Sequence, residues 1–204
     1  MEIVTAIKFQ KKNGSRVNVF LNNAFAFSVG ADVVQESDLR EGQALSQSQI
    51  ERLAKIDLLH RCWDVALGYL TYRPRSESEV RAHLHRRGFN EESIEKSLTR
   101  LREQGLVDDL AFAQFWKENR ESFSPRSCWL LQRELRQKGV DTEIISQVTE
   151  GLDEESSAYK AATEKAHNLV GCEYPIFFNK ISSFLRRRGF SYEVAKRVVN
   201  RLWQ

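Results

Sequence analysis

The chain of 204 residues lacks the short motifs that mark the commonest enzyme classes. It contains no G-x-x-x-x-G-K-[ST] loop for cradling phosphates, no G-x-G-x-x-G dinucleotide loop and no G-x-S-x-G nucleophile elbow. These absences give little sign of catalysis. We therefore expect neither an enzyme nor a bound cofactor.

Residues that bind metals or form disulfides are also few. Cys62, Cys128 and Cys172 stand far apart and make no C-x-x-C pair, which favours reduced thiols in a cytosol over a disulfide framework or a zinc site. His83 and His85 are two residues apart, so on a helix they point to different faces and do not form a metal-binding pair. We expect no metal site.

Long apolar runs are missing as well. No stretch is long enough to span a bilayer. The opening MEIVTAIKFQ lacks the basic segment and the following apolar segment that are typical of a signal peptide. We expect a cytoplasmic protein without a membrane partner.

Proline is rare, and its three positions reveal a repeat. Pro74, Pro125 and Pro175 each precede a glycine by the same distance, since 88 − 74 = 139 − 125 = 189 − 175 = 14. The glycines are spaced by 139 − 88 = 51 and 189 − 139 = 50 residues. Around them one phrase occurs in three versions: LHRRGFNEE (84–92), LRQKGVDTE (135–143) and LRRRGFSYE (185–193). A fixed period of this length is typical of a tandem repeat protein.

Each phrase predicts a helix, a glycine and a second helix. The glycine suits the C′ position, where a helix ends in the left-handed conformation; these residues are Gly88, Gly139 and Gly189. Two residues later stands a good N-cap of the next helix: Asn90, Asp141 and Ser191. Basic residues before the glycine suit a helix C-terminus electrostatically. The repeated phrase is therefore interpreted first as a structural connection between two helices.

Apolar residues recur at helical spacing throughout the repeats and predict three helices in each. We expect a mainly α fold of three tandem three-helix repeats in an elongated array, in which neighbouring repeats bury each other's faces. The predicted repeats are residues 46–105 with a lead-in helix, 106–152, and 153–204 at the basic C-terminal end.

Residues 1–45 predict an N-terminal β extension followed by a short connector. EIVTAIKFQ and RVNVFL are rich in β-branched and aromatic residues, and the Asn13-Gly14 pair between them is a strong hairpin signal. Asn22-Asn23 predicts a second turn and a third strand. We expect a small antiparallel sheet of three strands that packs on helices, because such a sheet is marginal alone.

Positive charge is concentrated near the C-terminus. Residues 176–204 contain seven Lys or Arg and one acidic residue, so this segment carries 7 − 1 = +6 in a chain of net charge +3. A basic surface attracts polyanions, of which nucleic acid is the commonest in a cytosol, although an acidic protein would also fit.

The adjacent pair Asp108-Asp109 is the best carboxylate candidate for metal or acid chemistry. The pair also stands where a helix needs an N-cap. No third ligand is visible in the sequence, and a magnesium site usually combines carboxylates with a phosphate partner. The cap is the favoured interpretation.

Three runs of sequence together resemble the RecX family of recombination regulators. They are LTYRPRSESEVRAHLHRRGF (70–89), GLVDDLAFAQFWKENR (105–120) and RELRQKGV (133–140). The N-terminal hairpin resembles the extension of longer family members, so the resemblance covers nearly the whole chain. One departure is Ser124-Pro125, where the family pattern has a glycine before the proline, and this leaves the local turn in doubt.

The resemblance implies tandem three-helix repeats and a non-catalytic regulator. RecX proteins bind the RecA recombinase filament on single-stranded DNA and typically restrain its ATP hydrolysis and strand exchange in recombination and repair. The implied partners are therefore RecA and, within that complex, single-stranded DNA. Nothing in the sequence demands a dimer, and we expect a monomer.

Charge alone selects the candidate contact residues. The first group is Arg186, Arg187, Arg188, Arg197 and Arg201, and the second is Arg81, Arg86, Arg87, Arg126, Arg133 and Arg136. The alternative for each is a solvated helix face or a cap.

Three other functions stay open at this point. A helical module that binds nucleic acid without RecA would show strongly salt-dependent DNA affinity. A nuclease centred on Asp108-Asp109 would need a metal ion. A scaffold for an unrelated partner would not bind RecA.

Overall fold

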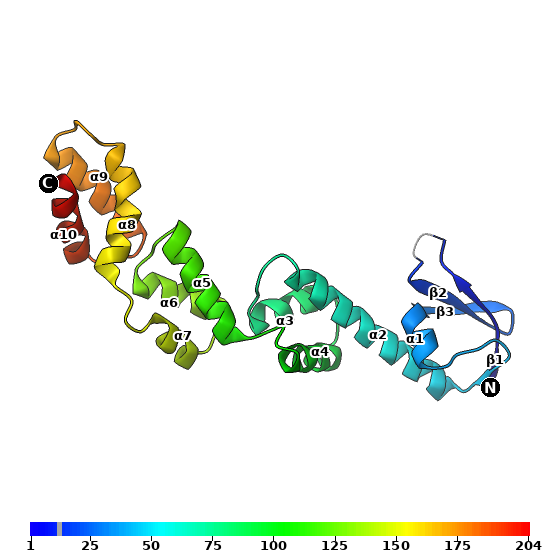
Figure 1. Ribbon diagram of the computed structural model, residues 1–204. Helices are drawn as coiled ribbons and strands as arrows, with labels where there is room; N and C mark the ends of the chain where they lie inside the picture. Colours follow the sequence, from blue (N-terminus) through cyan, green and yellow to red (C-terminus); the bar gives the residue numbers. More distant parts are fainter. Residues whose placement is uncertain (12–13) are drawn as a thin grey trace. The chain divides into compact units, whose positions relative to one another are not determined.

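The computed structural model describes residues 1–11 and 14–204, which contain ten α-helices and four β-strands. The predicted class, mainly helical with a small N-terminal antiparallel sheet, is confirmed (Figure 1). The elements are β1 (Glu2–Phe9), β2 (Arg16–Leu21), β3 (Ala24–Gly30), α1 (Ala31–Glu36), β4 (Ala44–Leu45), α2 (Gln47–Leu70), α3 (Glu77–Arg86), α4 (Glu91–Glu103), α5 (Asp109–Phe123), α6 (Cys128–Gln137), α7 (Thr142–Thr149), α8 (Glu154–His167), α9 (Tyr174–Arg187) and α10 (Tyr192–Trp203).

The chain divides into two compact units. The first unit comprises residues 1–72 and 81–101, and the second comprises residues 73–80 and 102–204. The first holds the sheet, α1, α2 and most of α3 and α4. The second holds the opening of α3 and all of α5 to α10.

The sheet of the first unit has the strand order β3-β2-β1-β4, with antiparallel pairing throughout. The prediction of three strands was wrong by one strand, because β4 pairs Ala44 and Leu45 with Ile3 and Glu2. A strand of two residues is too short to leave an alternating pattern in the sequence.

The predicted turn at Asn22-Asn23 is confirmed. Both residues have positive φ, 48° and 64°, as the two-residue hairpin turn with left-handed central residues requires. The other predicted turn, Asn13-Gly14, lies outside the described residues because Asn13 is not among them.

Burial and one charged pair fix the sheet to α2. The side chain of Asp57 on α2 accepts a hydrogen bond from the backbone N–H of Gly30 at 2.7 Å, and it pairs with both terminal nitrogens of Arg16 at 3.1 Å. Asp57 is buried, so these three contacts offset the cost of removing its charge from water. The apolar core between sheet and helix consists of Val4, Val17, Val19, Leu21, Val29, Val33, Leu39, Leu45 and Leu53.

The second unit contains two complete three-helix repeats, α5–α7 and α8–α10, each around its own apolar core. The first core consists of Phe112, Ala113, Leu131, Leu135, Val140, Ile145 and Val148. The second consists of Ala158, Ala161, Ala162, Phe177, Ile181, Leu185, Phe190, Val194, Ala195, Val198 and Val199. A core within each repeat explains why the apolar pattern recurs with the period of the sequence.

The repeated phrase ends the middle helix of each repeat in the same way. The backbone N–H of Val140 donates to the carbonyl of Leu135 at 3.2 Å, and that of Gly139 donates to Arg136 at 3.0 Å. Gly139 has φ of +76°, so this is the Schellman ending of a helix. Phe89 and Phe190 make the equivalent bonds to Leu84 and Leu185. Each of these apolar residues is buried, which fixes the direction in which the next helix leaves.

Candidate functional site

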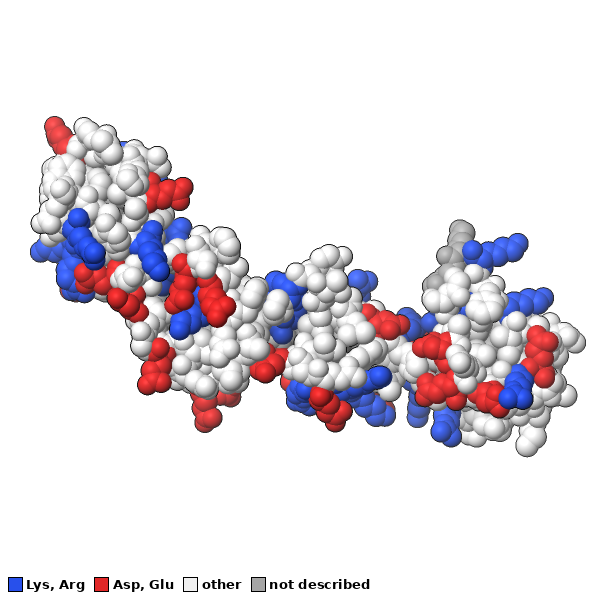
Figure 2. All heavy atoms as spheres, in the orientation of Figure 1, with Lys and Arg blue, Asp and Glu red and all other residues white. Residues whose placement is uncertain are grey.

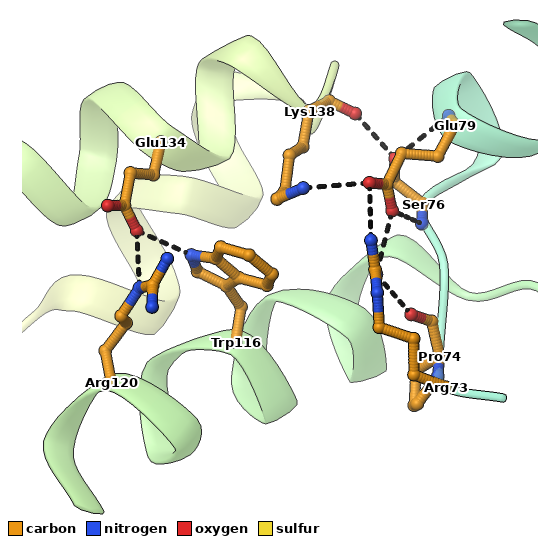
Figure 3. A network of polar contacts seen from close by, with 8 residues as sticks. All are labelled: Arg73, Pro74, Ser76, Glu79, Trp116, Arg120, Glu134 and Lys138. Carbon is orange, nitrogen blue, oxygen red and sulfur yellow. Dashed lines mark hydrogen bonds and ion pairs between the residues drawn. The ribbon is translucent and has the colours of Figure 1, made fainter. Parts of the chain in front are cut away.

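The N-terminus of α3 meets the C-terminus of α6 within the second unit, at a contact that we call the first joint (Figure 3). Ser76, the residue before α3, donates from its hydroxyl to the carbonyl of Lys138 at 2.6 Å. The backbone N–H of Glu77 donates to the Asp109 carboxylate at 2.8 Å. A hydroxyl and a carboxylate thus satisfy polar groups that helix ends leave unpaired.

The next repeat forms a corresponding contact with its successor, which we call the second joint, although the donor to the carbonyl is here a backbone N–H and not a hydroxyl. The backbone N–H of Ser127, which precedes α6, donates to the carbonyl of Arg188 after α9 at 3.1 Å. The backbone N–H of Cys128 donates to the Glu154 carboxylate at 2.9 Å. The sequence PRS, found at 74–76 and at 125–127, is therefore the segment that contacts the following repeat.

Asp108 and Asp109 have separate structural tasks. Asp108 accepts from the backbone N–H groups of Leu110 and Ala111 at 2.8 and 3.0 Å and caps its own helix, α5. Asp109 caps α3 instead, through Glu77. Burial and the nearby carboxylates raise the pKa of Asp109. Among the described residues, no group of three or more His, Cys, Asp or Glu is placed to hold a metal ion.

The other predicted caps stand at helix starts. The side chain of Asn90 accepts from Ser93 N–H at 3.0 Å. Asp141 accepts from Glu143 N–H at 2.8 Å, and Ser191 accepts from Val194 N–H at 3.3 Å. Gly88 and Gly189, like Gly139, have positive φ at the ends of the preceding helices.

A charged triad reinforces the first joint. Glu79 accepts from Arg73 at 2.8 Å and from Lys138 at 2.8 Å, and its second oxygen faces the backbone N–H of Ser76 (Figure 3). Burial alone would raise the pKa of Glu79, but the hydrogen bonds from Arg73 and Lys138 outweigh it and lower the pKa to about 2. The triad is therefore charged at neutral pH.

Trp116 lies beside this triad and joins it to a second carboxylate. Its indole N–H donates to Glu134 at 2.9 Å, and Glu134 also accepts from Arg120 at 2.8 Å (Figure 3). Lys138 and Arg120 lie 4.2 and 4.5 Å from the Trp116 ring, within the range of cation–π attraction. The half-buried indole is thus held in place by cations on its face and a carboxylate at its edge.

Four of the candidate arginines make ion pairs or side-chain hydrogen bonds within the chain. Arg81 pairs with Glu91 and Glu95, and Arg197 pairs with Glu155 at 2.8 Å. Arg126 pairs with Glu134 at 2.6 Å. Arg188 donates to the Ser124 hydroxyl and to the Pro125 carbonyl, both at 3.1 Å. The Ser124-Pro125 turn, which departs from the family pattern, is therefore fixed by Arg188.

The remaining candidates differ from these. Arg133 and Arg201 lie over the rings of Trp129 and Tyr159 at 5.6 and 4.4 Å. Five are exposed and make no side-chain ion pair or hydrogen bond with any residue that the structure describes: Arg86, Arg87, Arg136, Arg186 and Arg187. All five stand at the C-terminal end of the middle helix in their repeats.

A shallow groove lies beside the exposed Arg187 in the third repeat. It runs between α8 and α9 and is lined by Lys165, Leu169, Asn179, Lys180, Ser183 and Arg187, with no acidic residue. Figure 2 shows Lys and Arg side chains gathered at the end of α8–α10 that lies nearest to α5–α7. This surface can receive an anion without first breaking an internal ion pair.

Sequence reasoning did not find Arg73, Lys138 or Glu134 as members of a network. Two signals were available, namely the S-x-x-E capping box at Ser76 and the repetition of PRS. Neither signal indicates which distant residue completes the contact. In the part of the chain that the structure describes, no helix combines the length and the apolar composition needed to cross a membrane.

The fold and the surface define a class: a tandem array of three-helix repeats with an N-terminal sheet and a repeated basic helix end. Three family models match the chain. The N-terminal domain of regulatory protein RecX matches residues 2–46, the first RecX three-helix domain matches 62–101, and the second matches 108–148.

Similar proteins agree with these models. The regulatory protein RecX of Bacillus licheniformis is 33% identical over 198 residues, which cover 95% of this chain and 75% of that protein. The RecX of Listeria welshimeri is 29% identical over 197 residues, which cover 95% of this chain and 73% of that protein. The chain belongs to the RecX family of regulatory proteins.

Solved structures show the same fold. A crystal structure of regulatory protein RecX superimposes with a TM-score of 0.71 at 26% identity. The superposition covers 98% of this chain and 100% of that chain. RecX from Lactobacillus salivarius superimposes with a TM-score of 0.61 at 23% identity over 72% of this chain and 97% of that one.

Proposed function

We propose that this protein binds the RecA filament on single-stranded DNA and lowers its ATP hydrolysis and strand exchange, in recombination and DNA repair. The single observation that carries the proposal is membership of the RecX family over most of the chain. The proposed role is that of a non-catalytic, monomeric regulator in the cytoplasm, and it needs no cofactor.

The exposed arginines support a repeated contact. A filament presents the same surface at regular intervals, and this chain presents basic side chains at the same end of its three middle helices. Arg86, Arg87, Arg136, Arg186 and Arg187 are the residues that we propose for contact with acidic side chains or phosphates. Unlike paired arginines, they lose no internal partner on binding.

We also propose that the chain acts as four modules: the extension 1–45 and the repeats 46–105, 106–152 and 153–204. Each of the last two repeats has its own core, so each can contribute a contact separately. Within the second unit, the second joint then sets the spacing between the contacts of repeats 106–152 and 153–204.

The test is ATP hydrolysis by the RecA of the same organism on single-stranded DNA, with this protein added below one copy per RecA protomer. We expect hydrolysis to fall at concentrations that leave the bare DNA largely unbound. Anisotropy of the labelled DNA without RecA is the paired control. Unchanged hydrolysis together with strong, salt-sensitive DNA binding would contradict the proposal and favour a module that binds nucleic acid independently of RecA.

A further inference from the structure

The two joints differ in their charged residues, and the second joint holds an arginine without a carboxylate partner. In the first joint, Glu79 lies between Arg73 and Lys138. The repeat offset of 51 places Ser124 where Arg73 stands and Leu130 where Glu79 stands. The offset of 50 places Arg188 where Lys138 stands. The second joint has therefore kept one of the two cations, with a serine in place of the other cation and an apolar side chain in place of the carboxylate.

Arg188 has only neutral contacts in this position. One terminal nitrogen, Nη1, donates to both the Ser124 hydroxyl and the Pro125 carbonyl at 3.1 Å. The guanidinium carbon lies 4.6 Å from the centre of the Phe184 ring. The other donors, Nε and Nη2, make no hydrogen bond or ion pair with the residues that the structure describes.

A second arginine lies close to Arg188. Burial lowers the pKa of Arg188, and the charge of Arg126 lowers it further. Arg126 pairs at 2.6 Å with Glu134, which is also the partner of Arg120 at 2.8 Å. Arg120 and Arg126 thus share one carboxylate, and Arg188 has none, so these three guanidinium groups and Glu134 together carry 3 − 1 = +2.

We propose that Arg188, Arg126 and Ser124 bind a backbone phosphate of single-stranded DNA. A guanidinium group matches the tetrahedral oxygens of phosphate with two parallel N–H donors, and Arg188 has these donors available. The Ser124 oxygen accepts from Arg188, so its own O–H remains to donate to the anion. The phosphate would supply the negative charge that Glu79 supplies in the first joint.

The neighbouring surface favours a polymer of phosphates over the carboxylate of a protein partner. Arg186 and Arg187 precede Arg188 directly, and both are exposed. The groove between α8 and α9 adds Lys165 and Lys180 without an acidic residue. A series of cations fits an anion with one charge per nucleotide, and contacts along such a chain reinforce one another. This inference rests on the proposed function for its ligand, because it takes single-stranded DNA from the proposed complex.

The test restores the missing carboxylate. In Leu130→Glu, the second joint acquires the acid of the first joint, and Leu130→Gln is the matched uncharged control. The measurement is the anisotropy of a labelled oligothymidylate titrated with the full chain, without RecA, at several salt concentrations. We expect Leu130→Glu to bind about tenfold more weakly, as for loss of a charge-assisted hydrogen bond. Its plot of log affinity against log salt should be shallower by about 0.7 for each phosphate that the variant no longer binds. Leu130→Gln should bind as the wild type does.

A second pair of variants provides an independent test in case the Leu130 variants do not fold. Ser124→Asp places a carboxylate where the hydroxyl accepts from Arg188, and Ser124→Asn is its control. Unchanged DNA affinity in both acidic variants, with wild-type melting temperatures, would overturn the phosphate site. If those variants kept DNA affinity but no longer lowered ATP hydrolysis by RecA, the anion at the joint would be a protein carboxylate. If the wild type did not affect RecA while Leu130→Glu still bound DNA more weakly, the proposed function would fail and the phosphate site would stand.

Discussion

The carboxylate of Asp109 accepts a hydrogen bond from the backbone N–H of Glu77 at 2.8 Å, so the first helix of one repeat caps the second helix of the repeat before it. Glu154 does the same for Cys128 at 2.9 Å. Since the first N–H groups of a helix have no partner within the helix, each repeat depends on its successor for one of them. These contacts at the helix ends therefore specify which repeat follows which.

Loss of this shared cap should destabilise the protein. We expect Asp109→Ala to lower the free energy of unfolding by about 1–2 kcal/mol, because the half-buried N–H of Glu77 loses its acceptor. Urea denaturation measures the effect, with Glu118→Ala on the exposed side of the same helix as the control. A melting temperature that depends on magnesium in the wild type and not in Asp109→Ala would instead support a metal site.

The charged triad predicts a loss of stability in acid. The pKa of Glu79 lies at about 2, below its ordinary value of 4.5, so its contribution is fully present above pH 4.5 and disappears as the pH falls towards 2. The contribution is at most about 3 kcal/mol, from a shift of that size. Denaturation at pH 6 and at pH 3 should show that the free energy of unfolding falls more between these pH values in the wild type than in Glu79→Gln. Parallel losses in the two proteins would rule out the triad as a source of acid sensitivity.

Gly88 and Gly139 occupy the same position in two copies of the repeated phrase, but they should respond differently to substitution by alanine. Both Gly88 and Gly139 have positive φ, which costs an alanine about 1–2 kcal/mol. At Gly139 an added Cβ would also collide with Ser78 across the first joint, whereas at Gly88 it would meet nothing within 4 Å. We therefore expect Gly139→Ala to lower the melting temperature more than Gly88→Ala does. Equal effects would mean that Ser78 moves aside without cost.

Substitutions at residues 186–188 should distinguish arginines that bind the filament from an arginine that stabilises the fold. Arg186→Ala with Arg187→Ala should change the free energy of unfolding by less than about 0.5 kcal/mol, as is usual for exposed residues, while weakening binding to the RecA filament on DNA. Arg188→Ala should destabilise the protein by about 1–3 kcal/mol, because Ser124 and Pro125 lose their donor. Thermal melting together with a filament-binding assay distinguishes the two variants. If all three side chains proved equally dispensable for folding, the second joint would not depend on Arg188.

Much of the fold could be predicted from the sequence because its signals are local. The helix–glycine–helix phrase depends on residues within one or two turns of each other, such as Leu135, Gly139 and Asp141. The turn at Asn22-Asn23 is local in the same sense. The strand β4 was missed because its two residues are ordered by pairing with β1, which lies about forty residues earlier in the chain.

The candidate surface was predictable only as a set of charges. Arg186, Arg187 and Arg188 are chemically identical neighbours in the sequence. The tertiary structure alone half-buries one of them against Ser124, which is 64 residues away, and leaves the other two exposed. Arg186 and Arg187 can meet a partner with all their donors, whereas Arg188 uses one terminal nitrogen for Ser124 and Pro125 and has only Nε and Nη2 available.

The sequence by itself determined the repeat, the helix ends and the charge of the C-terminal repeat, because each depends on composition or on neighbours along the chain. Only the tertiary structure decided how one repeat joins the next. The contact between Ser76 and Lys138 spans 62 residues, and no periodic pattern specifies which hydroxyl meets which carbonyl. Helix ends leave polar groups unpaired, and packing selects the residues that satisfy them.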